Sequence, residues 1–261
     1  MIRRLPPILV ITCAVAILAA ACNVGSTAPA LTDPKEIVTA ALKSTEAAKS
    51  VHLAVTVDGK ATVSLQGGSG VGVPVNLTGT TAAADVDLAK SAAKATFAIP
   101  ALLGFAGELI VVDGKTYLKT TLTGPLYQES AAGSAPVDPS KTSGMIDNLG
   151  DLLLKDGVTL VKGDDVTCGS KQCYTVSADL TAQQLGTTGT GALGQLPVDL
   201  TGASLKLTVR VEKDLPHHLA GITAVLSMPD GTSVTAELTT SKWDEPVSIS
   251  APPADQVKPA K

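Results

Sequence analysis

Aromatic side chains are scarce in this chain of 261 residues: Trp, Tyr and Phe make up 2% of the sequence, although 44% of the residues are hydrophobic. Aromatic rings normally supply much of the bulk of a tightly packed core. An apolar interior built mainly from Ala, Val and Leu is unusual for a domain of this size. The composition therefore favours an apolar surface that lines a cavity over one that fills a solid core.

Basic residues are also in deficit, with 20 Lys and Arg against 24 Asp and Glu. The deficit grows when residues 1–21 are removed, because they contain Arg3 and Arg4 and no acidic residue. An acidic balance argues against binding to nucleic acid and against electrostatic docking on anionic lipid. We therefore predict no nucleic-acid partner.

The residue patterns of common catalytic sites are missing. No serine lies in a Gly-x-Ser-x-Gly elbow, and the glycine-rich runs at 67–72 and 186–194 do not match phosphate-binding loops. The three histidines, His52, His217 and His218, are expected to be exposed, on a strand and in a turn, without a functional role. We predict a protein that is not an enzyme and that needs no cofactor and no metal.

The N-terminus has the pattern of a bacterial lipoprotein signal. Two arginines precede an uncharged apolar run at residues 8–21, which ends at Cys22. A basic start, a short apolar run and small residues before the cleavage site are typical of secretory signals, and this run is shorter than a membrane span of roughly 20 residues. Residues 18–22 (LAAAC) resemble a lipobox, which predicts that the mature chain begins at Cys22 with an acyl anchor.

Two alternatives to this anchor stay open. Cys13 is a second cysteine in the signal, although Thr12 before it is a poor lipobox residue. The other alternative is an ordinary cleaved signal, in which Cys22 has no special role.

Cys168 and Cys173 are the two remaining cysteines, and four residues separate them. In an exported protein, a pair this close in sequence is typical of a disulfide across a hairpin. A metal site is the alternative, but no other Cys or His lies nearby in the sequence, and two ligands do not hold zinc. The spacing also exceeds the CxxC of thioredoxin-like redox proteins.

The rest of the chain alternates between apolar and polar residues with the period of two that is typical of antiparallel strands. The alternation is clearest at 205–212, and Asp113-Gly114 and Pro229-Asp230-Gly231 are hairpin signals. We predict about ten strands, a capped helix from Asp33 to near Ser50, a second helix at 140–154 and a short third helix near Thr181.

A single antiparallel sheet of this length has an apolar face that three modest helices cover only in part. The sheet either closes on itself or curls over a cavity, and an empty apolar cavity is costly unless a ligand such as a lipid fills it. Strand parity and one helix predict a cavity lined by Val55, Val57, Val86, Phe97, Ile99, Leu109, Val111, Leu118, Leu122, Leu149, Leu152, Leu153, Val176, Leu207, Val209 and Val211. For each of these residues, packing in the core is an equal alternative. Trp243 is expected to cap an edge of the sheet.

Several stretches, in order along most of the mature chain, resemble the LppX/LprA/LprF/LprG lipoproteins of mycobacteria and other actinobacteria. They are the lipobox at Cys22, Asp33-Pro34 before a helix, residues 57–59 (VDG), residues 111–117 (VVDGKTY), Asp138-Pro139-Ser140 before an amphipathic helix, and Trp243 followed by residues 251–255 (APPAD). Their order and spacing carry the resemblance, and the Cys168–Cys173 pair has no assigned place in it.

The resemblance implies an α+β, mainly antiparallel β fold: a strongly curved half-barrel sheet with helices over its concave face, similar to the carriers of the Lol lipoprotein-sorting system. It implies a hydrophobic cavity for di- to tetra-acylated lipids or glycolipids, which are carried from the plasma membrane toward the outer envelope. The chain then divides into a signal peptide (1–21), a lipidated tether (22–32), one lipid-binding domain (33–250) and an extended tail (251–261). We expect a monomer that Cys22 anchors to the outer face of the plasma membrane, with a membrane transporter as a candidate partner.

Two other hypotheses remain. The protein is a structural or interaction lipoprotein of the envelope, with a dry β domain that binds a partner through an edge strand. Alternatively, it is a hydrolase of lipids or glycans, which would require a nucleophile–base pair that the sequence does not display.

Overall fold

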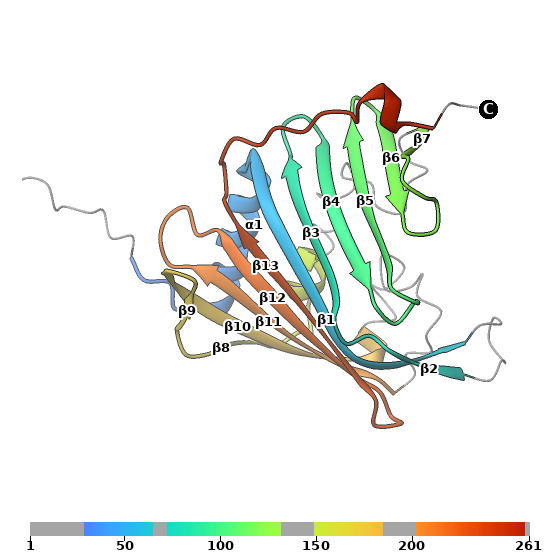
Figure 1. Ribbon diagram of the computed structural model, residues 1–261. Coiled ribbons are helices and arrows are strands. Elements are labelled where there is room, and N and C mark those ends of the chain that lie inside the picture. Colours follow the sequence, from blue (N-terminus) through green and yellow to red (C-terminus); the bar gives the residue numbers. More distant parts are fainter. Residues whose placement is uncertain (1–28, 65–71, 132–148, 185–201, 259–261) are drawn as a thin grey trace, which may run out of the picture. The chain divides into compact units, whose positions relative to one another are not determined.

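In the described part of the chain, thirteen strands form one antiparallel sheet (Figure 1). The computed structural model describes residues 29–64, 72–131, 149–184 and 202–258. Leu31–Lys261 make up one compact unit. The sequence alternation predicted about ten strands, and the structure divides the same stretches more finely.

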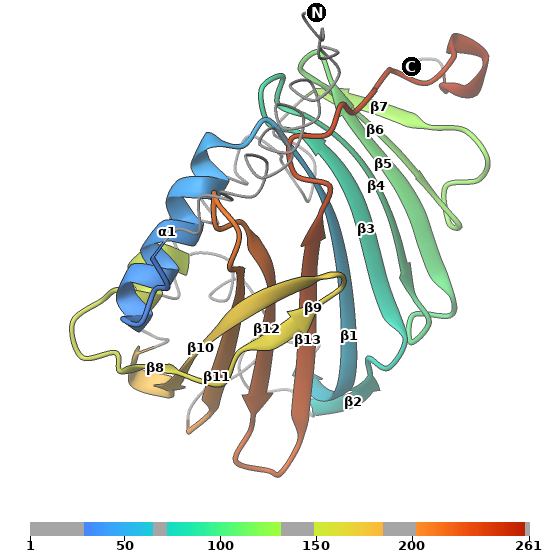
Figure 2. The ribbon, with the colours of Figure 1, turned by 90° about the vertical axis from the view of Figure 1, so that its left-hand side faces the viewer.

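The sheet has the order β7-β6-β5-β4-β3-β1-β13-β12-β11-β10-β8, with β2 paired to β1 and β9 paired to β10. The strands are β1 (Ser50–Ser64), β2 (Gly72–Asn76), β3 (Thr80–Asp87), β4 (Ala92–Ile99), β5 (Phe105–Val112), β6 (Lys115–Thr120), β7 (Gln128–Ala131), β8 (Leu160–Lys162), β9 (Val166–Cys168), β10 (Lys171–Thr181), β11 (Ser204–Glu212), β12 (Leu219–Ser227) and β13 (Ser233–Ser241). Strands β7 and β8 are the two ends of this order, so the sheet is an open half-barrel (Figure 2).

The two sequence-predicted hairpins are confirmed. Asp113 and Gly114 both have positive φ, 52° and 70°, and they connect β5 to β6. This backbone conformation matches the twist of the flanking strands and is easiest for Asp, Asn and Gly. Strands β12 and β13 pair from Gly221–Thr239 to Ser227–Ser233 around the second turn.

Helix α1 (Pro34–Ala47) begins as the sequence predicted. The Asp33 carboxylate accepts a hydrogen bond from the Lys35 backbone N–H at 2.8 Å, and Pro34 occupies the first turn, where its missing N–H is not needed. The helix ends slightly earlier than predicted, because the chain turns into β1 at Ser50. The Lys49 N–H bonds the Asp244 carboxylate in this connection, at 2.7 Å.

The main core lies between α1 and the strands β8, β10, β11 and β12 (Figure 2). From α1 it contains Ile37, Val38 and Ala41, and a helical segment at 149–153 adds Leu153. Residues 149–153 and 182–184 are helical, as predicted for the second and third helices, whose other residues lie outside the described part of the chain. Half of the sheet thus has a conventional aliphatic core.

The C-terminal segment packs against the sheet. It was predicted as an extended tail, but it contains a short 3-10 helix, η2 (Ala254–Gln256), and returns to the strand edge (Figure 1). Tyr127 and Val257 form a bridge in which the Tyr127 N–H donates to the Gln256 carbonyl at 2.8 Å. Ile249 and Val257 pack on a cluster that includes Ile110 and Tyr117. This segment therefore covers part of the outer face of β5 and β6.

The core between α1 and the sheet should dominate the stability of the protein. We expect Leu180→Ala to lower the free energy of unfolding by about 2–5 kcal/mol, because Leu180 is fully buried and truncation leaves a cavity. Urea denaturation measures the change. The matched control is Val161→Ala on β8, which is 54% exposed and should change stability by less than about 0.5 kcal/mol. Equal losses in both variants would contradict this placement of the core.

Candidate functional site

One face of the sheet is apolar from β10 to β6. The strand pairing shows this row by row, because directly opposed residues in antiparallel strands point to the same side. One row runs Val176, Val209, Ile222, Leu238, Val55, Ala82 and Phe97 across seven strands. A neighbouring row continues through Leu53, Ala84, Ala95, Leu109 and Leu118. The apolar face is thus continuous.

The two halves of this face differ in burial. On β10 and β11, Val176, Leu207, Val209 and Val211 are buried in the core under α1. On β1, β3 and β4, residues of the same face such as Val55, Ala84 and Ala95 are half-exposed. Helix α1 makes its main contacts with β8, β10, β11 and β12. The apolar face therefore extends beyond the strands that α1 covers.

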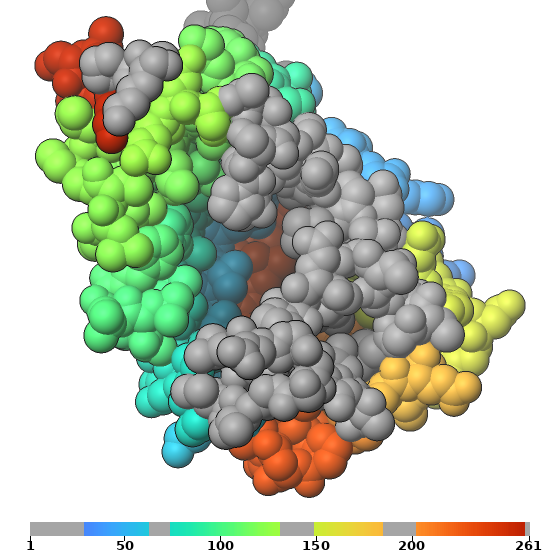
Figure 3. Space-filling view, turned by 90° about the vertical axis from the view of Figure 1, so that its right-hand side faces the viewer, coloured from blue at the N-terminus to red at the C-terminus, as the bar shows by residue number. Residues whose placement is uncertain are grey.

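The half of the face beyond α1 is hollowed. Figure 3 shows the hollow, with β1 and β13 at its floor and β4 to β6 along one wall. Its side chains are mainly Ala, Val and Leu, so few atoms project from the curved sheet. The scarcity of aromatic residues noted in the sequence thus coincides with a hollow, apolar surface.

All but one of the sequence-predicted cavity residues fall into three groups. Val55, Val57, Phe97, Ile99 and Leu118 are half-exposed on the apolar face, and Val86, Leu109 and Val111 are buried on the same face. Leu149, Leu152 and Leu153 join the core under α1 together with Val176, Leu207, Val209 and Val211. Packing in the core is therefore the observed environment for this last group.

The prediction that Leu122 lines the cavity is wrong. This residue was assigned to the cavity by extending the alternation of β6, but β6 ends at Thr120, and Leu122 lies in the following turn with 83% of its surface exposed. The turn forms because Thr120 and Thr123 bond to each other's backbone and side chains. Strand parity has no meaning beyond the end of the strand.

Strands β12 and β13 were missed as contributors. Ile222, Ala224, Ala236 and Leu238 lie on the same apolar face and are half-exposed. The alternation within β12 and the hairpin turn could have predicted this from the sequence, since the register of a hairpin determines which of its side chains share a face.

Phe97 and Gly107 are matched across β4 and β5. A Cβ atom on Gly107 would lie 2.5 Å from the Phe97 ring and 2.7 Å from the Lys119 carbonyl oxygen, so glycine gives the ring its space on the sheet. The Phe97 ring also meets Phe105, with 5.5 Å between ring centroids. These are the two phenylalanines of the chain, and both lie at one end of the apolar face.

The histidines in the β11–β12 turn correct a second prediction. His217 and His218 were expected to be exposed, but both are buried, because the turn folds back beside α1. The His218 Nδ1 and the Ser44 hydroxyl lie 2.6 Å apart, and the His218 ring stacks on Trp243 at 4.8 Å. Trp243 follows the central strand β13 instead of capping an edge, and its indole N–H donates to the Leu219 carbonyl at 3.0 Å.

The Ser44–His218 pair is a structural contact. It has the atoms of a nucleophile and a base, but both side chains are buried, so a substrate could not reach the serine oxygen. Burial lowers the pKa of His218, with Glu212 and Asp244 acting in the opposite direction. In the described part of the chain, no group of three or more His, Cys, Asp or Glu side chains is placed to hold a metal ion.

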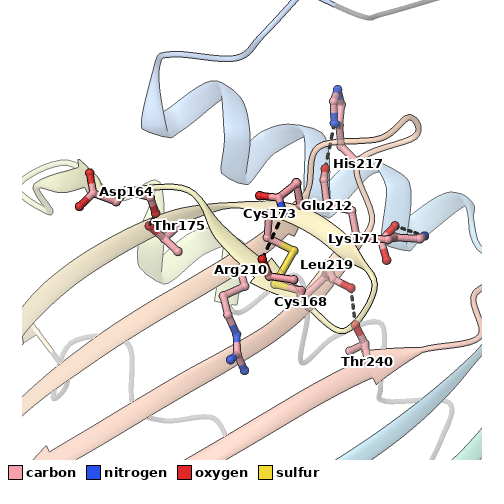
Figure 4. Close-up of a disulfide and its surroundings, with 12 residues drawn as sticks. Asp164, Cys168, Lys171, Cys173, Thr175, Arg210, Glu212, His217, Leu219 and Thr240 are labelled. Carbon is pink, nitrogen blue, oxygen red and sulfur yellow. Dashed lines mark hydrogen bonds and ion pairs between the residues drawn. A yellow bond between two sulfur atoms is a disulfide. The ribbon is translucent and has the colours of Figure 1, made fainter. Parts of the chain in front are cut away.

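Cys168 and Cys173 form a disulfide across the β9–β10 hairpin, with their Cα atoms 6.0 Å apart (Figure 4). Cys173 is fully buried. Beside it, Lys171 pairs with Glu212 at 2.5 Å, and Arg210 pairs with Glu237 at 2.7 Å. The disulfide thus closes a hairpin at the polar end of the sheet, away from the turns that follow β4 and β6.

The position of Cys22 lies outside the described residues, so its anchoring role stays a prediction. Among the described residues, no helix is long and apolar enough to cross a membrane.

Comparison with known proteins agrees with this geometry. The sequence model of the LppX_LprAFG lipoprotein family matches residues 33–249. The similar crystal structures include LprF from Mycobacterium bovis, with a TM-score of 0.59, 19% identity, and coverage of 86% of this chain and 99% of that one. They also include the lipoprotein LppX from Mycobacterium tuberculosis, with a TM-score of 0.53, 22% identity, and coverage of 83% of this chain and 98% of that one. No curated protein sequence gives a significant match.

The buried His218 should make stability depend on pH. Its folded pKa is lowered, so the unfolded chain binds a proton more readily, and the free energy of unfolding should fall as the pH decreases from about 6.5 toward the folded pKa. His218→Phe keeps a ring against Trp243 but cannot titrate. We expect its urea midpoint to decrease less than that of the parent between these pH values. Equal decreases in both proteins would contradict the assignment of this pH dependence to His218.

Proposed function

The chain belongs to the LppX_LprAFG lipoprotein family, and we propose that it carries multi-acylated lipids or glycolipids in the hollow of its sheet. The observation that carries the proposal is the apolar face of β1, β3, β4 and β5, which continues beyond the strands covered by α1 and is half-exposed at Val55, Ala84 and Ala95. The acyl chains would lie on this face, and a polar headgroup would remain at the opening.

The free energy of burying apolar surface supports an acyl ligand. Each methylene group that moves from water onto the apolar face stabilises the complex by about 0.8 kcal/mol. One long acyl chain would therefore contribute on the order of 10 kcal/mol before the costs of ordering it. Small aliphatic side chains suit this role because they leave space for the ligand and have no polar atoms that the acyl chain would desolvate.

Carriage of this kind needs no covalent chemistry. The family consists of lipoproteins, and the Ser44–His218 pair is buried, so this pair gives a hydrolase no accessible nucleophile. We propose that the protein moves lipid from the plasma membrane toward the outer envelope, as a monomer, with a membrane transporter as a partner. Cys22 would hold it at the outer face of the plasma membrane through its acyl chains.

The alternative is a structural envelope lipoprotein without lipid cargo. Native mass spectrometry of the mature chain, with organic extraction, separates the two functions. A bound di-, tri- or tetra-acylated lipid supports the carrier. A protein without ligand that takes up no added glycolipid would contradict it and favour the structural role.

Filling the hollow should reduce lipid binding. Ala95 lies on the apolar face between Ala84 and Leu109, and Ala95→Trp would place a large ring where the proposed acyl chain lies. We expect about tenfold weaker binding, equivalent to ~1.4 kcal/mol, in a fluorescent-lipid titration. The matched control is Thr96→Trp, because Thr96 is the next residue on the strand, is exposed and points to the outer face. Similar effects in both variants would place the ligand elsewhere.

The anchor can be tested by substitution. We expect Cys22→Ala to remove the covalent acyl chains and to shift the protein from the detergent phase to the aqueous phase in a detergent partition experiment. Cys13→Ala is the control, which should remain in the detergent phase. An unchanged mass and partition of Cys22→Ala would show that Cys22 is not the anchor.

A further inference from the structure

We propose that the apolar turns after β4 and β6 form a tip that inserts into a neutral lipid bilayer when lipid is exchanged. The tip consists of residues 100–104, between β4 and β5, and residues 121–124, after β6. The proposal deepens the proposed function, on which it rests, by naming the surface at which the hollow is loaded or emptied.

The tip exposes three large apolar side chains. Leu103 is 103% exposed, Leu122 is 83% exposed and Leu102 is 52% exposed. Single exposed leucines are common on protein surfaces, but these three come from two turns at the same end of neighbouring strands. The turns are joined where the Thr121 N–H donates to the Ala106 carbonyl at 2.9 Å.

The backbone at Leu103 adds a second cost. Its φ is +55°, in the left-handed region that favours Gly, Asn and Asp over leucine. Asn, Asp or Gly at this position would reduce the strain and remove the exposed apolar surface. An apolar side chain exposed at the very end of a turn, despite both preferences, is suited to insertion into a bilayer.

No charged residue lies in the tip. The chain has none between Lys94 and Glu108 and none between Lys119 and Glu129. A charged side chain is costly to transfer into a bilayer, whereas leucine is favourable there. The absence of positive charge also means that attraction to anionic headgroups is not what binds the tip, so hydrocarbon is the matching surface.

The tip is continuous with the hollow. Phe97, Ile99 and Phe105 lie on the apolar face just before or after the β4–β5 turn. The two phenylalanine rings are in contact, 5.5 Å apart between centroids. An acyl chain leaving a bilayer at the tip would therefore pass from leucine to phenylalanine to the aliphatic floor without crossing a polar row.

The proposed anchor would also keep the compact unit close to a lipid surface. In a chain anchored at Cys22, the nine residue steps to Leu31, where the compact unit begins, span at most roughly 30 Å. A protein partner is the less suitable occupant, because two narrow turns do not offer the broad flat area, about 800 Å² per partner, of a standard protein interface.

The test uses the mature chain from residue 22 with Cys22→Ser, so that no anchor contributes to membrane binding. The probe is vesicles of phosphatidylcholine in a flotation assay, at low and high salt. The variant is L102D/L103D, since aspartate suits the left-handed backbone at residue 103 and both positions are exposed. The matched control is Leu215→Asp, because Leu215 is 60% exposed in the β11–β12 turn at the opposite end of the sheet.

We expect the parent and the control to float equally and independently of salt. L102D/L103D should bind vesicles at least about tenfold more weakly than the parent. Lipid transfer between vesicles should slow in parallel. Three results would overturn the proposal that the tip inserts into a bilayer. They are flotation of L102D/L103D like that of the parent, an equal loss of flotation in the control, or no flotation of the parent. Capture of an envelope protein by the parent alone, without vesicle binding, would also overturn it.

Native mass spectrometry of the same samples separates the two proposals. If the parent contains bound lipid but does not float, membrane insertion of the tip is contradicted and the lipid-carrier function is still supported. If the parent floats in a tip-dependent way but contains no lipid, the lipid-carrier function is contradicted and the tip remains a membrane contact. Unchanged thermal unfolding of L102D/L103D shows that the variant is folded.

Discussion

The structure depends on a difference in extent between one long apolar sheet face and the helix α1, which covers only part of it. Cross-strand pairing carries the apolar face from β10 to β6, whereas α1 reaches β8, β10, β11 and β12. The sheet is not closed, since β7 and β8 lie at the two ends of the strand order and do not pair with each other. One half of the face becomes a core that stabilises the fold, and the other half curves into a hollow.

The two ends of the sheet have different chemistry. At the ends of β11 and β13, the chain is held by the His218–Trp243 stack, the Ser44–His218 contact and the nearby Cys168–Cys173 disulfide. On the outer face, Lys94, Glu108 and Lys119 form ion pairs, and the C-terminal segment packs beside Tyr127. At the opposite end, the turns after β4 and β6 are apolar and uncharged. These contacts lie at one end and on the outer face of the sheet, whereas the apolar turns lie at the other end.

Particular residues show how far sequence reasoning reached. Strand parity placed Val55, Phe97 and Leu109 on the face that the structure shows to be apolar. It failed at Leu122, where the strand had already ended, and at His217 and His218, whose burial comes from the fold of a turn against a helix more than 170 residues away in the sequence. Ile222 and Leu238 were missed because their hairpin was recognised without assigning its faces.

The sequence by itself determined the local and periodic features: the capped start of α1, the hairpin at Asp113-Gly114, the antiparallel strands and the shared face of their apolar residues. These follow from backbone preferences and from the period of two, which act over a few residues. Only the tertiary structure decided which half of that face is covered, since coverage depends on which strands α1 meets. It also decided that Leu102, Leu103 and Leu122 share one end of the sheet, because strand order brings together turns that the sequence separates.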